Sequence, residues 1–254
     1  MTKKTLIGVL ALALAFIGAG CNSSNNNNTT LVAPTVTATG TNGGATLHLS
    51  WGDVTGATSY EITAGDSIYT TTSTSFDVTK PVKTIAVKSV NGSTKSDSAA
   101  KIACAIVETT VDFFSDLDTS HANGFGFNGN GSVSTYSLYA GNLSSLDFYA
   151  ESSHAVTSLY SAAGVNANKK GNIMKAASGN YDSLLMADTL GAYVKTPMVI
   201  MADSTYYLRV SADTAGTWSN QDHFAKASVV AIDSAKVTMK LGYQPVPGIR
   251  WLIK

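Results

Sequence analysis

The chain has 254 residues, enough for one or two domains, and 13% of them are charged, against about 25% in ordinary soluble domains. Its 17 basic and 17 acidic residues balance and form no basic patch, so the composition argues against nucleic acid as a partner. Uncharged Ser, Thr, Asn and Gly replace the missing charges, as is common in exported β proteins.

The first twenty residues have the three parts of a secretory signal peptide. Lys3 and Lys4 give a positive start, residues 6–19 contain only apolar residues and glycine, and residues 18–20 are all small. The apolar run of 14 residues is too short for a membrane-spanning helix, which needs about 20.

Cys21 stands directly after these small residues and resembles the cysteine of the bacterial lipobox. The resemblance implies cleavage before Cys21, diacylglycerol on its thiol, an acylated amine, and therefore a membrane as a partner through the lipid anchor. Asn22 follows instead of the aspartate typical of inner-membrane retention, which implies the bacterial outer membrane, on its periplasmic side or at the cell surface. The alternative is an ordinary cleaved signal that leaves Cys21 free.

A polar spacer follows the cysteine. Residues 22–30 read NSSNNNNTT, which cannot bury enough apolar surface to offset the entropy of ordering. We therefore divide this part into a signal peptide, residues 1–20, and a lipidated cysteine with a flexible linker, residues 21–30. With Cys21 lipidated, Cys104 has no partner for an intrachain disulfide, and the apolar run 102–106 predicts a buried thiol.

Residues 31–106 predict a first domain made of short strands. Apolar and polar residues alternate over residues 45–51, 57–63, 75–78 and 85–90, with turn residues between these segments. Asn91-Gly92 is a tight-turn signal. Several short strands at regular spacing predict a β-sandwich.

Three motifs occur in order along about 75 residues of this segment: Leu49-Ser-Trp51, GATSYEI over residues 56–62, and VKSVNG over residues 87–92. With these motifs the segment resembles a fibronectin type III domain. The resemblance implies a sandwich that serves as a spacer or as an adhesive module.

Residues 107–254 predict a second, larger antiparallel β-sandwich, jelly-roll-like, so that the whole fold is all-β. Strands are expected at residues 133–140, 146–151, 206–210, 224–232 and 237–243, the last two as a hairpin. In residues 146–151, Phe148 and Ala150 are expected to point inward, and Asp147, Tyr149 and Glu151 outward. After Pro245 and Pro247, residues 249–253 are expected to pack back on the sandwich.

Three stretches of this second part predict irregular structure. The glycine-rich residues 123–131 and residues 164–179 are expected to be loops, where binding usually resides. One helical turn is expected around residues 182–190.

The sequence lacks the motifs of common enzymes and metal sites. No HExxH, GxSxG, Walker or paired CxxC pattern occurs. Asp147 and Glu151 lie about 13 Å apart on an extended strand, too far for a glycosidase pair. Residues 116–127 lack the glycine and glutamate of a calcium-binding loop. The sequence therefore predicts neither an enzyme nor a metal site.

A few aromatic residues and histidines are candidate ligand-binding groups. Tyr149, Tyr207 and Trp218, expected to be exposed with Tyr136, have rings that stack on sugars, although cross-strand packing is the commoner use of such residues. His154 and His223, with His121, are candidate haem ligands, or else surface histidines. The strands from residue 206 to 243 faintly resemble haem-binding lipoproteins of the HmuY kind.

The leading hypothesis is a non-enzymatic, lipid-anchored cell-envelope protein. Its fibronectin-like spacer would present the second sandwich for binding or adhesion, with a glycan or an envelope protein as partner and without a cofactor. A ligand-binding module for glycan or haem is the alternative, and a hydrolase with scattered carboxylates is a third.

Overall fold

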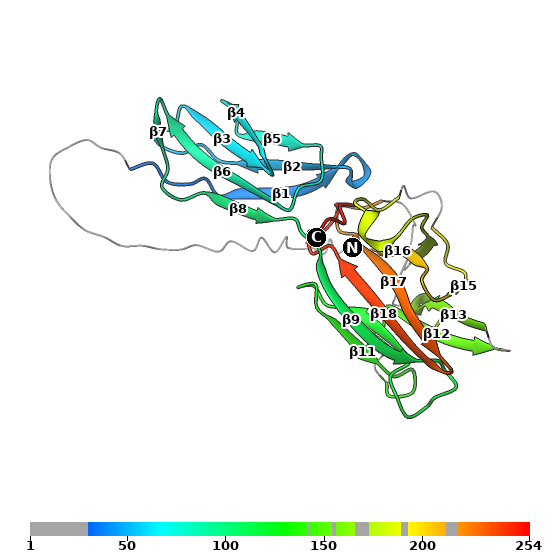
Figure 1. Ribbon diagram of the computed structural model, residues 1–254. Helices are drawn as coiled ribbons and strands as arrows, with labels where there is room; N and C mark the ends of the chain where they lie inside the picture. Colours follow the sequence, from blue (N-terminus) through cyan, green and yellow to red (C-terminus); the bar gives the residue numbers. More distant parts are fainter. Residues whose placement is uncertain (1–29, 142, 154–155, 166–172, 189–192, 212–217) are drawn as a thin grey trace, which may run out of the picture.

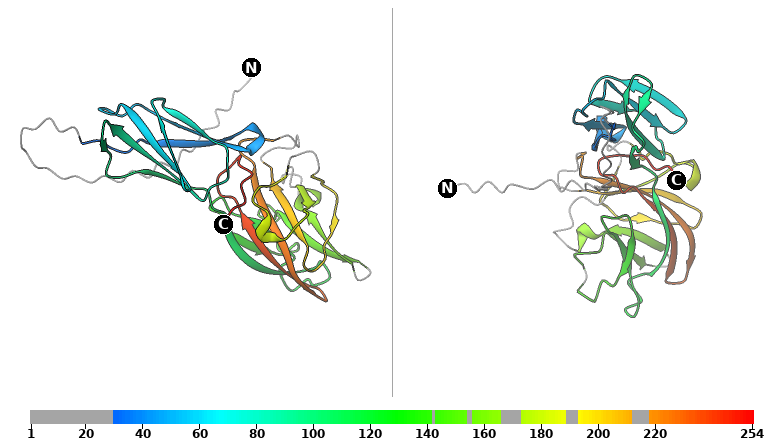
Figure 2. Two further views of the ribbon diagram at one scale, coloured as in Figure 1. Left: turned by 45° about the horizontal axis from the view of Figure 1, so that its top comes forward. Right: turned by 90° about the vertical axis from the view of Figure 1, so that its left-hand side faces the viewer.

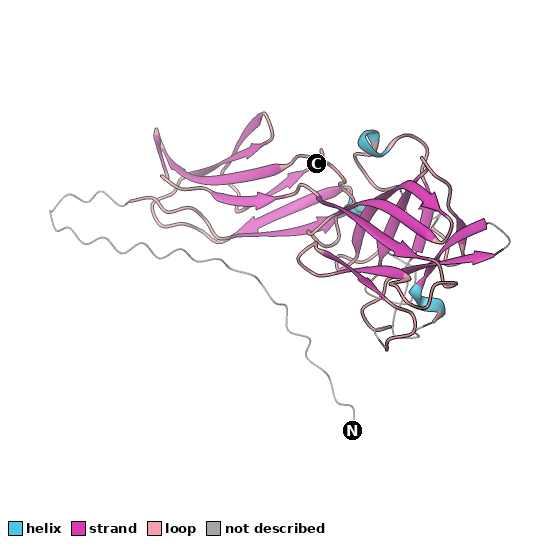
Figure 3. Ribbon diagram, turned by 60° about the horizontal axis from the view of Figure 1, so that its bottom comes forward, coloured by secondary structure: helices cyan, strands magenta, loops and turns pink. Residues whose placement is uncertain are grey.

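The computed structural model describes residues 30–141, 143–153, 156–165, 173–188, 193–211 and 218–254. Nearly all regular structure in this part of the chain is β-strand, in four antiparallel sheets (Figures 1 and 3). The all-β fold expected from the alternating sequence is confirmed. None of the helices in the described residues is long and apolar enough to cross a membrane.

The first sandwich consists of a three-stranded sheet and a larger one. The three-stranded sheet has the order β1 (Val36–Thr41), β2 (Thr46–Trp51), β5 (Ser75–Val78). The larger sheet has the order β4 (Ser67–Thr71), β3 (Ser59–Ala64), β6 (Thr84–Asn91), and β7 (Thr94–Lys95) and β8 (Ala100–Ala103) both pair with the far side of β6. The four strands predicted in this segment are therefore confirmed.

The alternating residues of these strands form the core between the two sheets. Leu47 and Leu49 of β2 face Ile62 of β3 and Val87 of β6, and all four are fully buried. Trp51 meets Tyr60 edge to face, with ring centroids 5.2 Å apart. Cys104 is also fully buried, as predicted, and burial raises the pKa of its thiol to about 12.

The second sandwich is built from two five-stranded sheets. One has the order β11 (Val133–Tyr136), β10 (Gly124–Phe127), β12 (Phe148–Ser153), β13 (Val156–Ser161), β15 (Met198–Val199). The other has the order β14 (Ile173–Ala176), β16 (Thr205–Val210), β17 (His223–Asp233), β18 (Lys236–Tyr243), β9 (Val107–Phe114). Phe125, Phe148 and Leu159 of the first sheet pack against Leu208 and Met239 of the second.

The expected irregular stretches contain more order than their composition predicts. Residues 123–131 include β10, and residues 164–179 include β14. The glycines of β10 serve close packing, because a Cβ atom on Gly126 would collide with the Ser145 carbonyl oxygen. The expected helical turn is the short 3-10 segment η3 (Tyr181–Ser183); η1 (Asn42–Gly44) and η2 (Ala162–Gly164) are similar turns.

Tyr149 lies outside the main core that contains Phe148 and Ala150, as expected for the outward face, but this face is not open to solvent. Asp147 and Tyr149 are 1% and 3% exposed, because Tyr149 packs with Leu146 and Ala162 in a small separate cluster outside the main core. The Asp147 carboxylate accepts a hydrogen bond from the Phe127 backbone at 2.8 Å. Both faces of β12 are therefore covered.

The C-terminal residues 249–253 pack back, as expected, and they reach the core of the first sandwich. Ile249 and Trp251 are fully buried there, beside Leu47 and Leu49. The Trp251 indole donates to the Ala45 carbonyl oxygen at 3.0 Å. In Figures 1 and 2 this red segment lies where the two sandwiches meet.

Candidate functional site

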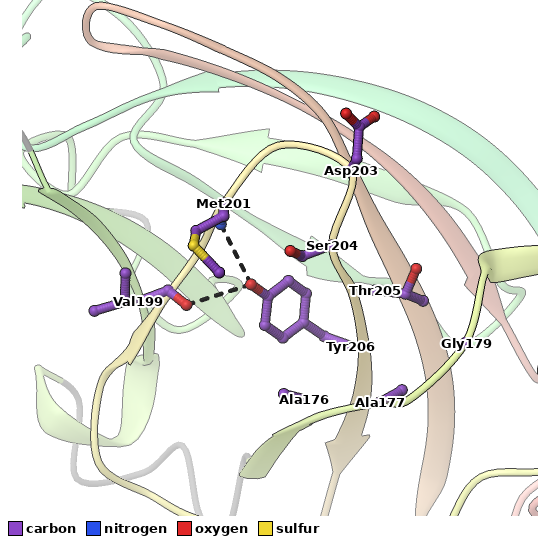
Figure 4. A pocket seen from close by; sticks show the side chains of 9 residues that line it. All are labelled: Ala176, Ala177, Gly179, Val199, Met201, Asp203, Ser204, Thr205 and Tyr206. Carbon is purple, nitrogen blue, oxygen red and sulfur yellow. Dashed lines mark hydrogen bonds between the residues drawn. The ribbon is translucent and has the colours of Figure 1, made fainter.

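A shallow hollow of about 310 Å³ opens in the second sandwich between the edge strands β14 and β15. Figure 4 shows the Tyr206 ring at its centre, between the strand carrying Val199 and the segment carrying Ala176 and Ala177. The remaining lining residues are Gly179, Met201, Asp203, Ser204 and Thr205.

Tyr206 fixes the geometry of this hollow. Its hydroxyl donates to the Val199 carbonyl oxygen and accepts from the Met201 backbone N–H, both at 3.3 Å. The side chain, 2% exposed, therefore ties β16 of one sheet to the β15 end of the other. The hydrogen bonds of Tyr206 therefore hold the two sheet edges that border the hollow in place.

A tight turn forms the rim. Asp203 has a φ of 61°, a left-handed conformation in which Asp is one of the tolerated residues. Its backbone N–H donates to the Val229 carbonyl oxygen at 2.8 Å, which anchors the turn to β17. In Figure 4 its carboxylate points away from the Tyr206 ring.

The lining of the hollow mixes polar and apolar groups, and two of its apolar side chains are exposed. The side chains of Val199 and Met201 are 51% and 62% exposed, so both belong to the exposed large apolar residues of the protein. The hydroxyl of Tyr206 is engaged in holding the fold, and the Asp203 carboxylate is directed elsewhere. No group of three His, Cys, Asp or Glu side chains suited to a metal occurs among the described residues.

The predicted sugar-stacking residues lie apart from this hollow, in packed surroundings. The Tyr149 ring stacks on Tyr160, with centroids 5.1 Å apart, and burial raises the pKa of the Tyr149 phenol, helped by the nearby Glu151 carboxylate. Tyr207 is 9% exposed and packs with Phe224. The expectation that Tyr149 and Tyr207 are exposed is therefore wrong.

Trp218, the third predicted aromatic residue, is half-buried near the junction of the two sandwiches. Its indole donates to the Gly248 carbonyl oxygen at 3.2 Å. This hydrogen bond links the loop before β17 to the C-terminal segment.

The predicted histidines are not brought together. His223 stacks on Tyr243 at one end of β18, and His121 stacks on Phe114, which pairs with Lys236 at the other end. Seven residues of extended strand separate these ends by about 23 Å. His121 and His223 therefore do not share one metal or haem iron. His154 and Cys21 lie outside the described residues.

Sequence reasoning missed a group of buried charges on β16, on β17 and at the residue directly before β17. Arg209 and Asp222 are both 0% exposed, and two guanidinium nitrogens contact one Asp222 oxygen at 3.0 and 2.6 Å. Lys226, 1% exposed, donates to the Leu184 carbonyl oxygen at 3.0 Å and lies over the Tyr181 ring. Burial lowers the pKa of this lysine.

These charges have a structural place, because they lie beneath the segments that connect the two sandwiches. Asp222 also accepts from the Ser219 backbone N–H at 2.8 Å, which holds the loop that carries Trp218. The sequence contains one weak signal for this buried group. Tyr207 stands between Tyr206 and Leu208, so β16 has apolar residues on both faces, which indicates that other segments cover both faces of the strand.

No protein-family model matches the chain, and no curated protein is significantly similar to it in sequence.

Proposed function

We propose that this chain is a non-enzymatic, lipid-anchored protein of the bacterial outer membrane. A fibronectin type III-like sandwich acts as a spacer, and the second sandwich is held out for binding or adhesion. The observation that carries the proposal is the order of the N-terminal features: positive residues, an apolar run, small residues, Cys21, and then a polar stretch before the first strand.

The physical basis of the anchor is the burial of hydrocarbon. Each buried CH₂ group contributes about 0.8 kcal/mol, so a single chain binds marginally and several acyl chains hold firmly. The polar residues 22–30 then place the folded part beyond the headgroups. The anchor explains how a chain with few charges and no long apolar helix in its described part would stay at a membrane.

The arrangement of the first sandwich supports the spacer. A three-stranded sheet faces a larger one across a core that contains Trp51 and Tyr60, two residues of the fibronectin-like pattern. Sandwiches of this architecture recur in many cell-surface proteins. The larger sheet ends at β8, whose chain continues through Cys104 and Ile106 into β9 of the second sandwich.

Binding through a surface is favoured over a deep glycan or haem pocket. Tyr149 and Tyr207 are engaged in packing, and His121 and His223 lie beside opposite ends of β18, which are about 23 Å apart. The hollow is shallow, its lining mixes polar and apolar groups, and Val199 and Met201 are exposed beside it, as suits a contact with a side chain of an envelope protein. The proposed partner is accordingly a protein, with glycan as the alternative.

Mass spectrometry of the N-terminal peptide from membrane fractions tests the anchor. We expect cleavage before Cys21 and a peptide that carries diacylglycerol and an amide-linked acyl chain. Cys21→Ser should abolish both modifications and move the protein out of the detergent-rich phase. The matched control Cys104→Ala, at a buried cysteine, should leave them unchanged. An unmodified Cys21 thiol on wild-type protein would overturn the proposal.

A further inference from the structure

The edge strand β4 is unusually exposed. It has five residues, Ser67 to Thr71, the first four of which are exposed, and it pairs with β3 on one side. Ile68 and Tyr69 are 66% and 42% exposed. Within the described residues no strand pairs with its other side, so its outward backbone N–H and C=O groups are available to a further strand.

β4 also lacks the features that usually protect such an edge. Natural edges carry lysine, inward charges, proline or a bulge, or are covered by another segment. The other edge strands of the first sandwich do carry such features. β8 contains Lys101, and β5 contains Asp77, which is paired with His48. The backbone of Gly248 approaches β1 closely at Gly40. By contrast, residues 67–75 read SIYTTTSTS, without charge or proline and rich in β-branched residues.

Its backbone is nevertheless held in a regular extended form. All five residues are in continuous register with β3, from Tyr60 opposite Thr71 to Ala64 opposite Ser67. Tyr69, opposite the buried Ile62, turns toward the core side and packs on Phe76 with ring centroids 5.1 Å apart. Ile68 lies on the other face of the sheet. The edge is therefore preorganised for pairing.

We propose that β4 pairs antiparallel with β4 of a second copy of this chain, about a two-fold axis at Tyr69. Centring on Tyr69 is the register that pairs all five residues of both strands. It places Tyr69 opposite Tyr69 and Ile68 opposite Thr70, aromatic and β-branched pairs that favour sheet formation. Asp66 then lies opposite Thr72, so no like charges meet across the interface.

The geometry of the chain leaves room for this pairing. β4 and β8 occupy opposite edges of their sheet, and β8 leads toward the second sandwich. In Figure 1, β4 lies at the top of the first sandwich and the second sandwich lies below it. Two copies would join their larger sheets into one continuous sheet across an isologous interface, in which both copies use the same strand.

The interface is small and the pairing is accordingly weak. Contacts below about 1,200 Å² of total buried surface belong to transient encounters. We expect a dissociation constant in the micromolar to millimolar range. The lipid anchor proposed above would confine copies to one surface and favour pairing, but the pairing itself does not depend on it.

Sedimentation velocity of the full chain carrying Cys21→Ser tests the proposal without the anchor. We expect a concentration-dependent dimer. Adding Ile68→Lys should leave a monomer, because it places an ammonium group on each strand of the interface. The matched control Val230→Lys introduces the same charge at a residue 52% exposed on β17 and should leave the dimer intact. A monomer at all concentrations, or a dimer that survives Ile68→Lys, would overturn the proposal.

Cysteine cross-linking tests the register in the same background. Chains with Ile68→Cys mixed with chains carrying Thr70→Cys should form a disulfide between copies, because the two residues face each other. Each variant alone should cross-link poorly, since identical residues become diagonal neighbours about 7–8 Å apart, beyond disulfide reach. Cys104 is fully buried and should not interfere. Cross-linking of each variant alone, with none between them, would contradict the register.

Discussion

At the scale of single residues, His223 illustrates how burial changes the pKa of a side chain. Its ring stacks on Tyr243 and its Nδ1 lies 3.1 Å from the Gln244 carbonyl oxygen. Burial lowers the pKa of His223 below its ordinary value of 6.5, and this effect exceeds the opposite effects of the Gln244 carbonyl and the Asp222 carboxylate. Folding therefore favours the neutral form of this imidazole.

The lowered pKa predicts a pH dependence of stability with a definite sign. Between the folded pKa and 6.5, the unfolded chain binds more protons at His223, so the free energy of unfolding falls as the pH drops below 6.5. The loss is about 1.4 kcal/mol for each unit by which the pKa is lowered. Urea unfolding at pH 7.5 and pH 5 measures it.

The control for this prediction is His223→Gln, which keeps a polar side chain but does not titrate. The variant should lose less stability than wild type between the two pH values, since all other titrating groups are shared. The carboxylates of Asp112, Asp118 and Asp182, whose pKa values are lowered by hydrogen bonds, should act below pH 5. An equal loss in both proteins would contradict the assignment to His223.

At the scale of elements, β10 shows glycine acting as a packing residue within a strand. A Cβ atom on Gly124 would collide with the Phe148 carbonyl oxygen, and one on Gly126 with the Ser145 carbonyl oxygen. Both obstacles are backbone atoms, which cannot rotate away. These glycines let the segment that leads into β12 lie against β10.

Gly126→Ala should therefore destabilise the protein by about 1–3 kcal/mol, the usual cost of overpacking. Gly129→Ala is the matched control, because a Cβ atom there meets nothing within 4 Å. Its effect should stay within about 0.5 kcal/mol, as for ordinary surface substitutions. Equal midpoints of chemical unfolding for the two variants would contradict the packing role of Gly126.

The same strand explains which elements the sequence could predict. Alternation identified β2, β3, β16, β17 and β18, because each has regular apolar positions on one face. In β10 the sequence GFGF reads as a flexible loop, since glycine usually marks a turn. The close approach that requires glycine here depends on residues 145–148, about twenty positions away, and is not visible locally.

The candidate site residues were misplaced for a related reason. Alternation separates the two faces of a strand but does not indicate whether a second layer covers the outer one. Tyr149 is covered by its packing with Leu146 and Ala162, and Tyr207 by Phe224 and the C-terminal segment. The hollow around Tyr206 is formed by the edges of two sheets, so no single stretch of sequence predicts it.

At the scale of the whole molecule, the C-terminal segment joins the two sandwiches. The Arg250 guanidinium donates to the Gly43 carbonyl oxygen, in the first sandwich, at 2.7 Å and to the Ala187 carbonyl oxygen at 2.5 Å. The Gln244 side chain donates to the carbonyl oxygens of Cys104 and Trp251 at 3.0 and 2.7 Å. The last residues of the chain therefore complete elements formed some two hundred positions earlier.

Two adjacent residues of this segment divide their contacts between the sandwiches, which allows a matched test. Trp251 packs into the core of the first sandwich, and Leu252 packs with Ile106 and Phe224 beside the second; both are 0% exposed. Trp251→Ala should cost about 3–5 kcal/mol and Leu252→Ala about 2–5 kcal/mol. Hydrogen-exchange mass spectrometry shows where each loss falls. Trp251→Ala should reduce protection first in β2, β3 and β6, and Leu252→Ala first in β16 and β17. If Trp251→Ala left the protection of β2 and β6 unchanged, the first sandwich would be stable without the end of the chain, and the segment would be a surface contact rather than part of its core.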